Sequence, residues 1–126
     1  MEEPYKSACE EIVEAMNAYP EMVAGTEGFC TEFLKHTKGR FCAKLGAEAV
    51  YCIGVRGQDL GIAVKIGDGN YRALYPAVMS VLKQLELLSE EEEKALESFA
   101  CPDNLNDHGV AIGKIEPAFA LKFHNR

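Results

Sequence analysis

RFCAKLGAEAVYCIGVRGQDLGIAVKIGDGN, the stretch from Arg40 to Asn70, decides the fold of this chain. It contains three short apolar runs, and turns that carry glycine follow them. Runs of this length and spacing are typical of a compact antiparallel meander. We therefore expect three strands, at about residues 40–45, 50–55 and 60–66.

The first run places a lysine on the side of its strand opposite the phenylalanine. Successive side chains of a strand point to opposite faces, so Lys44 should point away from the layer that holds Phe41. Gly46 and Ala47 follow with no bulky side chain, and Glu48 adds a carboxylate. This group is suited to recognise a zwitterion. The plainer alternative is a solvated strand-end lysine with a carboxylate nearby on the surface.

An apolar stripe at helical spacing precedes the meander and predicts a first helix. Pro20 ends that helix, because the residue before a proline is disfavoured in the helical conformation. Thr26 is expected to cap a second, short helix that carries Phe29 on its inner side. The residues of the first stripe are Ala8, Ile12, Val13, Met16 and Tyr19.

The longest amphipathic stripe follows the meander and predicts a helix at about residues 71–88 that packs across a face of the sheet. Pro76 fits its first turn, where the missing N–H breaks no hydrogen bond. Ser89 and Glu92 form a capping-box pattern for a further helix. Residues 101–107 are expected to form a loop, and residues 110–115 a last strand. The predicted fold class is therefore α+β, an antiparallel sheet covered by helices, in a single domain over residues 1–126.

Composition and charge exclude several classes of function. The chain has 126 residues, a net charge of -7 and a pI near 5.0. A nucleic-acid surface needs clustered Lys and Arg, which the sequence lacks. Its apolar stretches are shorter than the roughly 20 residues of a membrane-spanning helix, and its N-terminus opens with acids where a signal peptide carries positive charge. We expect a cytoplasmic protein without a nucleic-acid or membrane partner.

The five cysteines are an odd number and include no CxxC pair, which argues against a zinc site and against a secreted disulfide framework. We expect reduced packing cysteines, no metal site and no cofactor. Cys42 and Cys52 lie in predicted strands, where a thiol behaves as a small apolar residue. Cys30 is the exception, because it lies at the start of a predicted helix, where a thiolate is stabilised.

Four motifs in order resemble the L-asparaginase II family: YPEMVAGTEGF, AKLGAEAVY, GIAVKIGDGNYRA and NDHGVAIGKIEPAF. The resemblance extends from about residue 10 to residue 121. It implies the C-terminal portion of a fold related to serine β-lactamases and glutaminases. It also implies hydrolysis of the L-asparagine side-chain amide to L-aspartate and ammonia, through an acyl-serine intermediate.

The resemblance also assigns roles to residues of the meander. Lys44 resembles the strand lysine that sets protonation around the nucleophile or holds the substrate carboxylate. Gly46 and Ala47 would offer backbone to the substrate, and Glu48 and Cys30 complete the expected substrate-binding set. A departure from the family pattern follows this set: Ala49 stands where the family has glycine, which would crowd the site.

Family members are much longer than this chain, which resembles only their C-terminal part. A Ser-x-x-Lys nucleophile motif, a CSGKH motif and a DGC motif that can supply metal ligands are expected outside these residues. Three alternatives follow: a C-terminal domain that is inactive alone, a split subunit that completes its site with an N-terminal partner chain, or a noncatalytic binding module. The expected partners are L-asparagine, for the complete enzyme, and either the N-terminal half or further copies of the chain.

Overall fold

The structure is a computed structural model that describes residues 2–124. Its helices are α1 (Glu3–Ala18), α2 (Glu21–Ala24), α3 (Phe29–Thr37), the 3-10 turn η1 (Tyr71–Ala73), α4 (Leu74–Gln84), α5 (Glu90–Ala95) and α6 (Glu97–Ala100). Its strands are β1 (Phe41–Gly46), β2 (Val50–Val55), β3 (Leu60–Lys65), β4 (Asp103–Leu105) and β5 (Ala111–Lys114).

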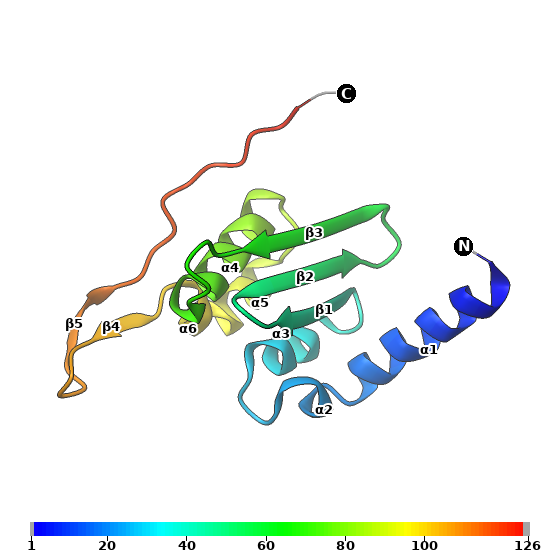
Figure 1. Cartoon of the computed structure of the whole chain (residues 1–126), viewed down its shortest axis with the longest axis horizontal. Helices are drawn as coiled ribbons and strands as arrows, with labels where there is room; N and C mark the ends of the chain where they lie inside the picture. Colours follow the sequence, from blue (N-terminus) through cyan, green and yellow to red (C-terminus); the bar gives the residue numbers. More distant parts are fainter. Residues whose placement is uncertain (1, 125–126) are drawn as a thin grey trace. The chain divides into compact units, whose positions relative to one another are not determined.

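The three expected strands form one sheet in the order β1-β2-β3, and neighbouring strands run in opposite directions (Figure 1). Each strand begins and ends within one residue of its expected bounds. Helices and antiparallel strands together confirm the α+β class.

The residues group into two compact units. The first contains the chain up to Gly46 together with Tyr51–Ala63, and the second contains Ala47–Val50 together with the chain from Val64 onward. The single domain expected from the sequence stays a prediction, as does the packing of the helix after the meander across the sheet.

The core of the first unit is aromatic. Helix α3 packs against β1, and Phe29 and Phe33 on α3 meet the inner face of the sheet. The Phe33 ring centroid lies 5.1 Å from that of Phe41, and the Phe29 centroid lies 5.3 Å from that of Tyr51. All four side chains are buried. Tilted ring pairs of this kind add about 0.5–1.5 kcal/mol each to the gain from burial.

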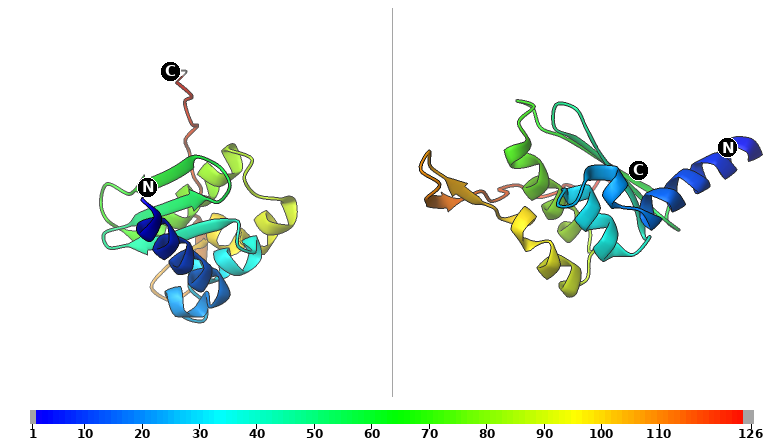
Figure 2. Two further views of the ribbon diagram at one scale, coloured as in Figure 1. Left: turned by 90° about the vertical axis from the view of Figure 1, so that its right-hand side faces the viewer. Right: turned by 90° about the horizontal axis from the view of Figure 1, so that it is seen from below.

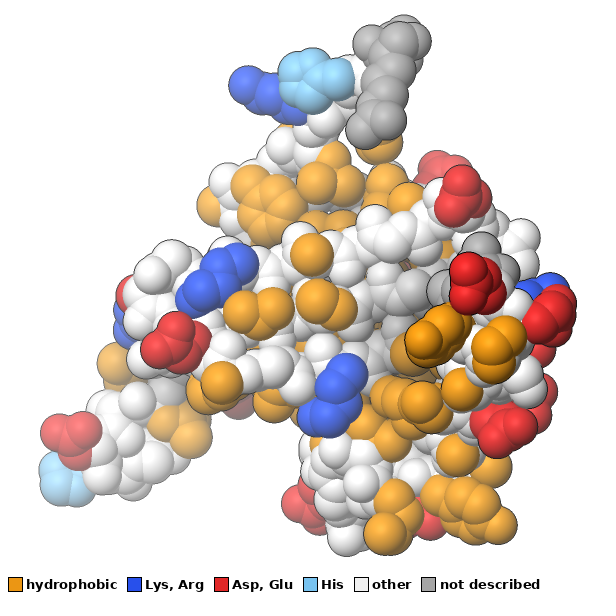
Figure 3. Space-filling view, turned by 45° about the vertical axis from the view of Figure 1, so that its right-hand side comes forward, with side chains coloured by type: hydrophobic (Ala, Val, Ile, Leu, Met, Phe, Trp, Pro, Cys, Tyr) orange, Lys and Arg blue, Asp and Glu red, His pale blue; other side chains and the backbone are white. Residues whose placement is uncertain are grey.

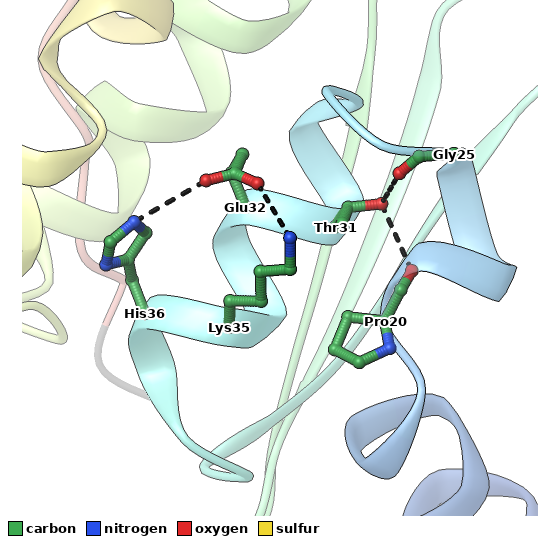
Figure 4. Close-up of polar contacts among 6 residues, drawn as sticks. All are labelled: Pro20, Gly25, Thr31, Glu32, Lys35 and His36. Carbon is green, nitrogen blue, oxygen red and sulfur yellow. Dashed lines mark hydrogen bonds and ion pairs between the residues drawn. The ribbon is translucent and has the colours of Figure 1, made fainter.

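The loop before α3 is fastened by a buried threonine. Thr31 Oγ1 lies 3.1 Å from the Pro20 carbonyl oxygen and 2.6 Å from that of Gly25 (Figure 4). The expected cap at Thr26 is wrong, because α3 begins only at Phe29 and its N-cap is Gly28. Thr31 thus ties the loop to the helix through its side chain, and the cap position itself has no side chain.

The N-terminal helix forms where the sequence predicts it, and it ends before Pro20. Its apolar stripe does not enter a core, however, since none of the residues Glu3–Ala18 is buried. Asn17 attaches the helix near its C-terminal end, where Nδ2 donates to the carbonyl oxygens of Val13 and Phe41 at 2.9 and 3.0 Å.

In the second unit, α4 is shorter than the expected helix at 71–88. It begins after a 3-10 turn and ends at Gln84, because Glu86 adopts a left-handed conformation (φ 54°) that stops a helix. Pro76 occupies the first turn as expected. The capping box before α5 is confirmed, since the Ser89 and Glu92 side chains each accept a hydrogen bond from the other's backbone N–H.

A two-stranded hairpin lies near the C-terminus. The expected last strand is β5, and it pairs antiparallel with β4, which lies where a loop was expected. The loop prediction failed because Pro102 and the asparagines favour turns, whereas pairing with β5 extends the backbone here. Within residues 2–124, no helix has the length and apolar character required to span a bilayer.

Candidate functional site

The outer face of the sheet carries a shallow open depression within the first unit. Its floor is made of small side chains on alternate residues of the strands. A Cβ placed on Gly54 would lie 3.9 Å from Cβ of Cys42, so these two residues are neighbours on adjacent strands. The lining residues are Cys42, Lys44, Cys52, Ile53, Gly54, Gly61, Ile62 and Ala63.

Lys44 lies at this depression, and its predicted orientation is confirmed. Phe41 and Ala43 are buried, whereas Lys44 on the same strand is exposed. Its Nζ donates to the Leu45 carbonyl oxygen at 3.1 Å. Within residues 2–124 the Lys44 ammonium forms no ion pair, so the carboxylate of a ligand could pair with it.

The chain then enters a turn with two consecutive left-handed residues, Glu48 (φ 57°) and Ala49 (φ 55°). A non-glycine residue in this conformation costs roughly 1–2 kcal/mol. Two hydrogen bonds within the second unit hold this turn in place: Lys65 Nζ donates to the Glu48 carbonyl oxygen at 2.5 Å, and the Ile66 N–H donates to the Ala49 carbonyl oxygen at 3.0 Å. The expected substrate-binding residues Ala47 and Glu48 are both exposed in this turn.

Ala49 shows why glycine suits this position. A glycine adopts positive φ without the steric cost of a Cβ atom. The Ala49 side chain is fully buried, so its methyl group packs inside the protein. The visible consequence of the alanine is backbone strain, which is a different effect from the crowding of a site.

The cysteines are less uniform than expected. Cys30 is the second residue of α3 and only 1% exposed, so its assignment to substrate binding stays a prediction that this burial does not favour. Cys52 is exposed, which corrects its expected role as a packing residue. Burial raises the pKa of the Cys42 thiol, Arg56 opposes this rise, and Cys9 adds to it.

The small residues of the outer face were not singled out in the sequence, although a signal was present. In the second strand Cys52 and Gly54 alternate with the large residues Tyr51, Ile53 and Val55. Large and small side chains then lie on opposite faces of the strand. This alternation predicts that the outer face is either open to solvent or in close contact with another molecule or segment.

A sequence profile of the family described as L-asparaginase II matches residues 1–117. The chain belongs to the L-asparaginase II family. The match includes all of the first unit and most of the second, including Lys44 and the strained turn. A search of curated proteins finds no match. Membership of the L-asparaginase II family supports an asparaginase-like amidohydrolase, and it indicates L-asparagine as the substrate.

One Ser-x-x-Lys spacing does occur in this L-asparaginase II chain, contrary to the expectation from the sequence: Ser80 is followed by Lys83. Both line a cavity of about 440 Å³ in the second unit. Their contacts do not resemble an activated nucleophile. Ser80 Oγ accepts from Gln84 Nε2 at 2.9 Å, and Lys83 pairs with Glu93 at 3.1 Å.

The position of Ser80 within α4 also argues against nucleophilic chemistry. Ser80 is the seventh residue of the helix, after the first turn whose N–H groups are left without intrahelical partners. An oxyanion hole needs such unused donors. As to metals, no three His, Cys, Asp or Glu side chains among residues 2–124 are grouped so as to hold an ion.

Proposed function

We propose that this chain forms one wall of an L-asparagine amidohydrolase site, as the C-terminal part of an L-asparaginase II enzyme, and that Lys44 is the lysine of that site. The observation that carries the proposal is the exposed ammonium of Lys44 on the small-residue face of the sheet, which forms no ion pair with any of residues 2–124. The family match supports the reaction.

In the reaction proposed, a serine hydroxyl attacks the side-chain amide carbon of L-asparagine. Its proton passes to the leaving nitrogen, ammonia departs, and an acyl-serine remains; water then hydrolyses this ester to L-aspartate. Lys44 acts at this site through its positive charge, either by setting the protonation of the nucleophile or by holding the substrate carboxylate. Gly46 and the exposed Ala47 leave the backbone beside the lysine open to a substrate.

The chain alone is expected to be inactive, because Ser80 lacks the environment of a nucleophile and another segment must supply one. The direct test is an assay of ammonia release from L-asparagine and from L-glutamine. We expect no turnover from the purified chain. Turnover that persists through repurification and disappears in Ser80→Ala would overturn this part of the proposal and place the nucleophile in α4.

A second assay tests whether this chain forms one wall of the site. The chain is mixed with a separately produced N-terminal half of an L-asparaginase II enzyme, and ammonia release is measured against each half alone. Activity that appears only in the mixture, and is lost with Lys44→Met, supports a complementing role. A stable complex without activity would favour the noncatalytic module instead.

A further inference from the structure

The segment after β5, residues 115–124, runs through the second unit as an extended chain without helix or strand (Figures 1 and 2). Two hydrogen bonds fasten its beginning. The Ile115 N–H donates to the Pro102 carbonyl oxygen at 2.9 Å, and Cys101 Sγ donates to Glu116 Oε1 at 3.5 Å. In Figure 3, hydrophobic side chains lie directly below the Lys and His side chains at the end of the described chain.

Further along, the segment is held by one side chain, that of Gln84, the last residue of α4. Gln84 Nε2 donates to the Phe119 carbonyl oxygen at 3.2 Å, and the Leu121 N–H donates to Gln84 Oε1 at 2.7 Å. The amide therefore pairs with the backbone on both sides of Ala120, as the backbone of a neighbouring strand would. Its second Nε2 hydrogen bond goes to Ser80 Oγ at 2.9 Å. We call the two hydrogen bonds to the segment the clamp.

The same segment forms part of the wall of a cavity of about 440 Å³ in the second unit. Pro117 lines this cavity together with side chains of α4, α5 and α6, which include Met79. Cys101, whose thiol contacts Glu116, lines it as well. A cavity of roughly 300–1,000 Å³ is of the size that holds a small organic molecule. Pro117 lies between the contact at Glu116 and the clamp at Gln84, so it leaves the wall only when one of these contacts breaks.

We propose that residues 117–121 are a latch that closes this cavity, and that Gln84 is the residue that holds the latch shut. The thiol of Cys101 is a weak donor, whereas the Gln84 amide supplies both an ordinary donor and an ordinary acceptor. The clamp is therefore the stronger of the two contacts. Segments held by few hydrogen bonds near solvent are the ones that open locally while the rest of a protein stays folded.

The latch is independent of the site proposed around Lys44, which lies in the first unit. The match to the L-asparaginase II profile ends at residue 117, so the clamped residues Phe119 and Leu121 lie beyond it. The latch would control access to the cavity of the second unit, whatever the state of the sheet.

Hydrogen exchange of the full chain, followed by NMR, tests the clamp. The Leu121 amide should be protected in the wild-type chain, because its N–H is bonded to Gln84. Gln84→Met keeps the length and the helix propensity of the side chain but removes both hydrogen bonds of the clamp. Exchange at Leu121 should then accelerate at least about fivefold. The control is Ser80→Ala, which removes the third contact of the same amide and should leave this rate nearly unchanged.

Alkylation of Cys101 by a bulky maleimide tests whether the latch closes the cavity, with the exposed Cys9 as the reference in the same sample. Gln84→Met should raise the rate at Cys101 at least about fivefold. Leu121→Pro should do the same, because it removes the N–H of the clamp. It changes no helix, so it also covers the case that Gln84→Met fails to fold. Ala120→Pro is its matched control, since the clamp does not use that N–H, and it should behave as the wild-type chain.

Three results would each overturn the proposal. The first is a Leu121 amide that exchanges without protection in the wild-type chain. The second is a labelling rate at Cys101 that stays unchanged in both Gln84→Met and Leu121→Pro. The third is an equal acceleration in Ala120→Pro and Leu121→Pro, which would mean that the segment responds to any proline and that the clamp does not hold it.

Discussion

The inner and outer faces of the three-stranded sheet come from alternate residues of the same strands, yet they differ in almost every property. The inner face holds large buried side chains, which include Phe41, Tyr51 and Ile53. The outer face holds the small residues of the depression together with the charged side chains Lys44 and Lys65. One face has its partner, helix α3, within the same unit, and the other is open there. Stability and function are therefore expected to respond to different substitutions on neighbouring residues.

The largest effect is expected on the inner face. Phe41→Ala removes a fully buried ring that contacts Phe33, and it should lower the free energy of unfolding by about 3–5 kcal/mol. Such a loss is a large part of the roughly 5–15 kcal/mol that keeps a domain folded. Urea denaturation of the chain measures it. Cys42→Ala, one residue further on and on the outer face, is the control and should cost less than about 1 kcal/mol. Equal losses from the two substitutions would remove the distinction between the faces.

The next effect concerns chemistry on the outer face. In the complete L-asparaginase II enzyme, Lys44→Met should reduce kcat/KM by roughly 10²–10³-fold, the usual effect of removing a group that stabilises a developing charge. Stability should stay within about 0.5 kcal/mol, because methionine keeps most of the apolar stem. Steady-state kinetics also separate the two roles of the lysine: a raised KM with normal kcat indicates substrate binding, and a lowered kcat indicates protonation of the nucleophile. Near-normal turnover would mean that Lys44 is part of the scaffold.

A smaller effect is expected from Lys65, two strands along the sheet from Lys44. Its ammonium donates to the carbonyl oxygens of Glu48 and Ile66 and so holds the strained turn. Both contacts are exposed to solvent, so Lys65→Met should cost only about 1 kcal/mol of unfolding free energy. In the complete enzyme, the Lys65→Met variant should lose activity only in proportion to the fraction of the protein that no longer folds. A loss of kcat in fully folded Lys65→Met would instead assign chemistry to Lys65 as well.

The difference between the two faces of the sheet could largely be predicted from the sequence, because the alternation of side chains along a strand is a local property. Phe41 and Lys44 fell on the expected faces, and the three strands fell at the expected positions. Glycine-bearing turns and the period of two are sufficient for that. The capping box at Ser89 was equally local, since its two hydrogen bonds join residues only three apart.

The features that the sequence did not predict depend on contacts between distant residues. Thr31 donates to carbonyl oxygens 6 and 11 residues away, and α3 begins only at Phe29, so Thr26 is not its cap. The strand β4 depends on its pairing with β5. The sequence also predicted an apolar stripe on α1, but not that none of its residues would be fully buried, because periodicity shows that a face is apolar without showing what covers it.

The smallest effect separates two thiols of the outer face. Cys52 is exposed, whereas Cys42 is half-buried and its burial raises the pKa of its thiol. The thiolate is the reactive form, so a raised pKa lowers the reactive fraction of Cys42 at any pH below that pKa. Iodoacetamide should therefore modify Cys52 faster than Cys42, and the gap should narrow as the pH rises and Cys42 ionises. Mass spectrometry of quenched time points gives both rates in one sample, with the exposed Cys9 as an internal reference. Faster labelling of Cys42 would contradict this prediction, because it would show that the outer face is more accessible at β1 than at β2.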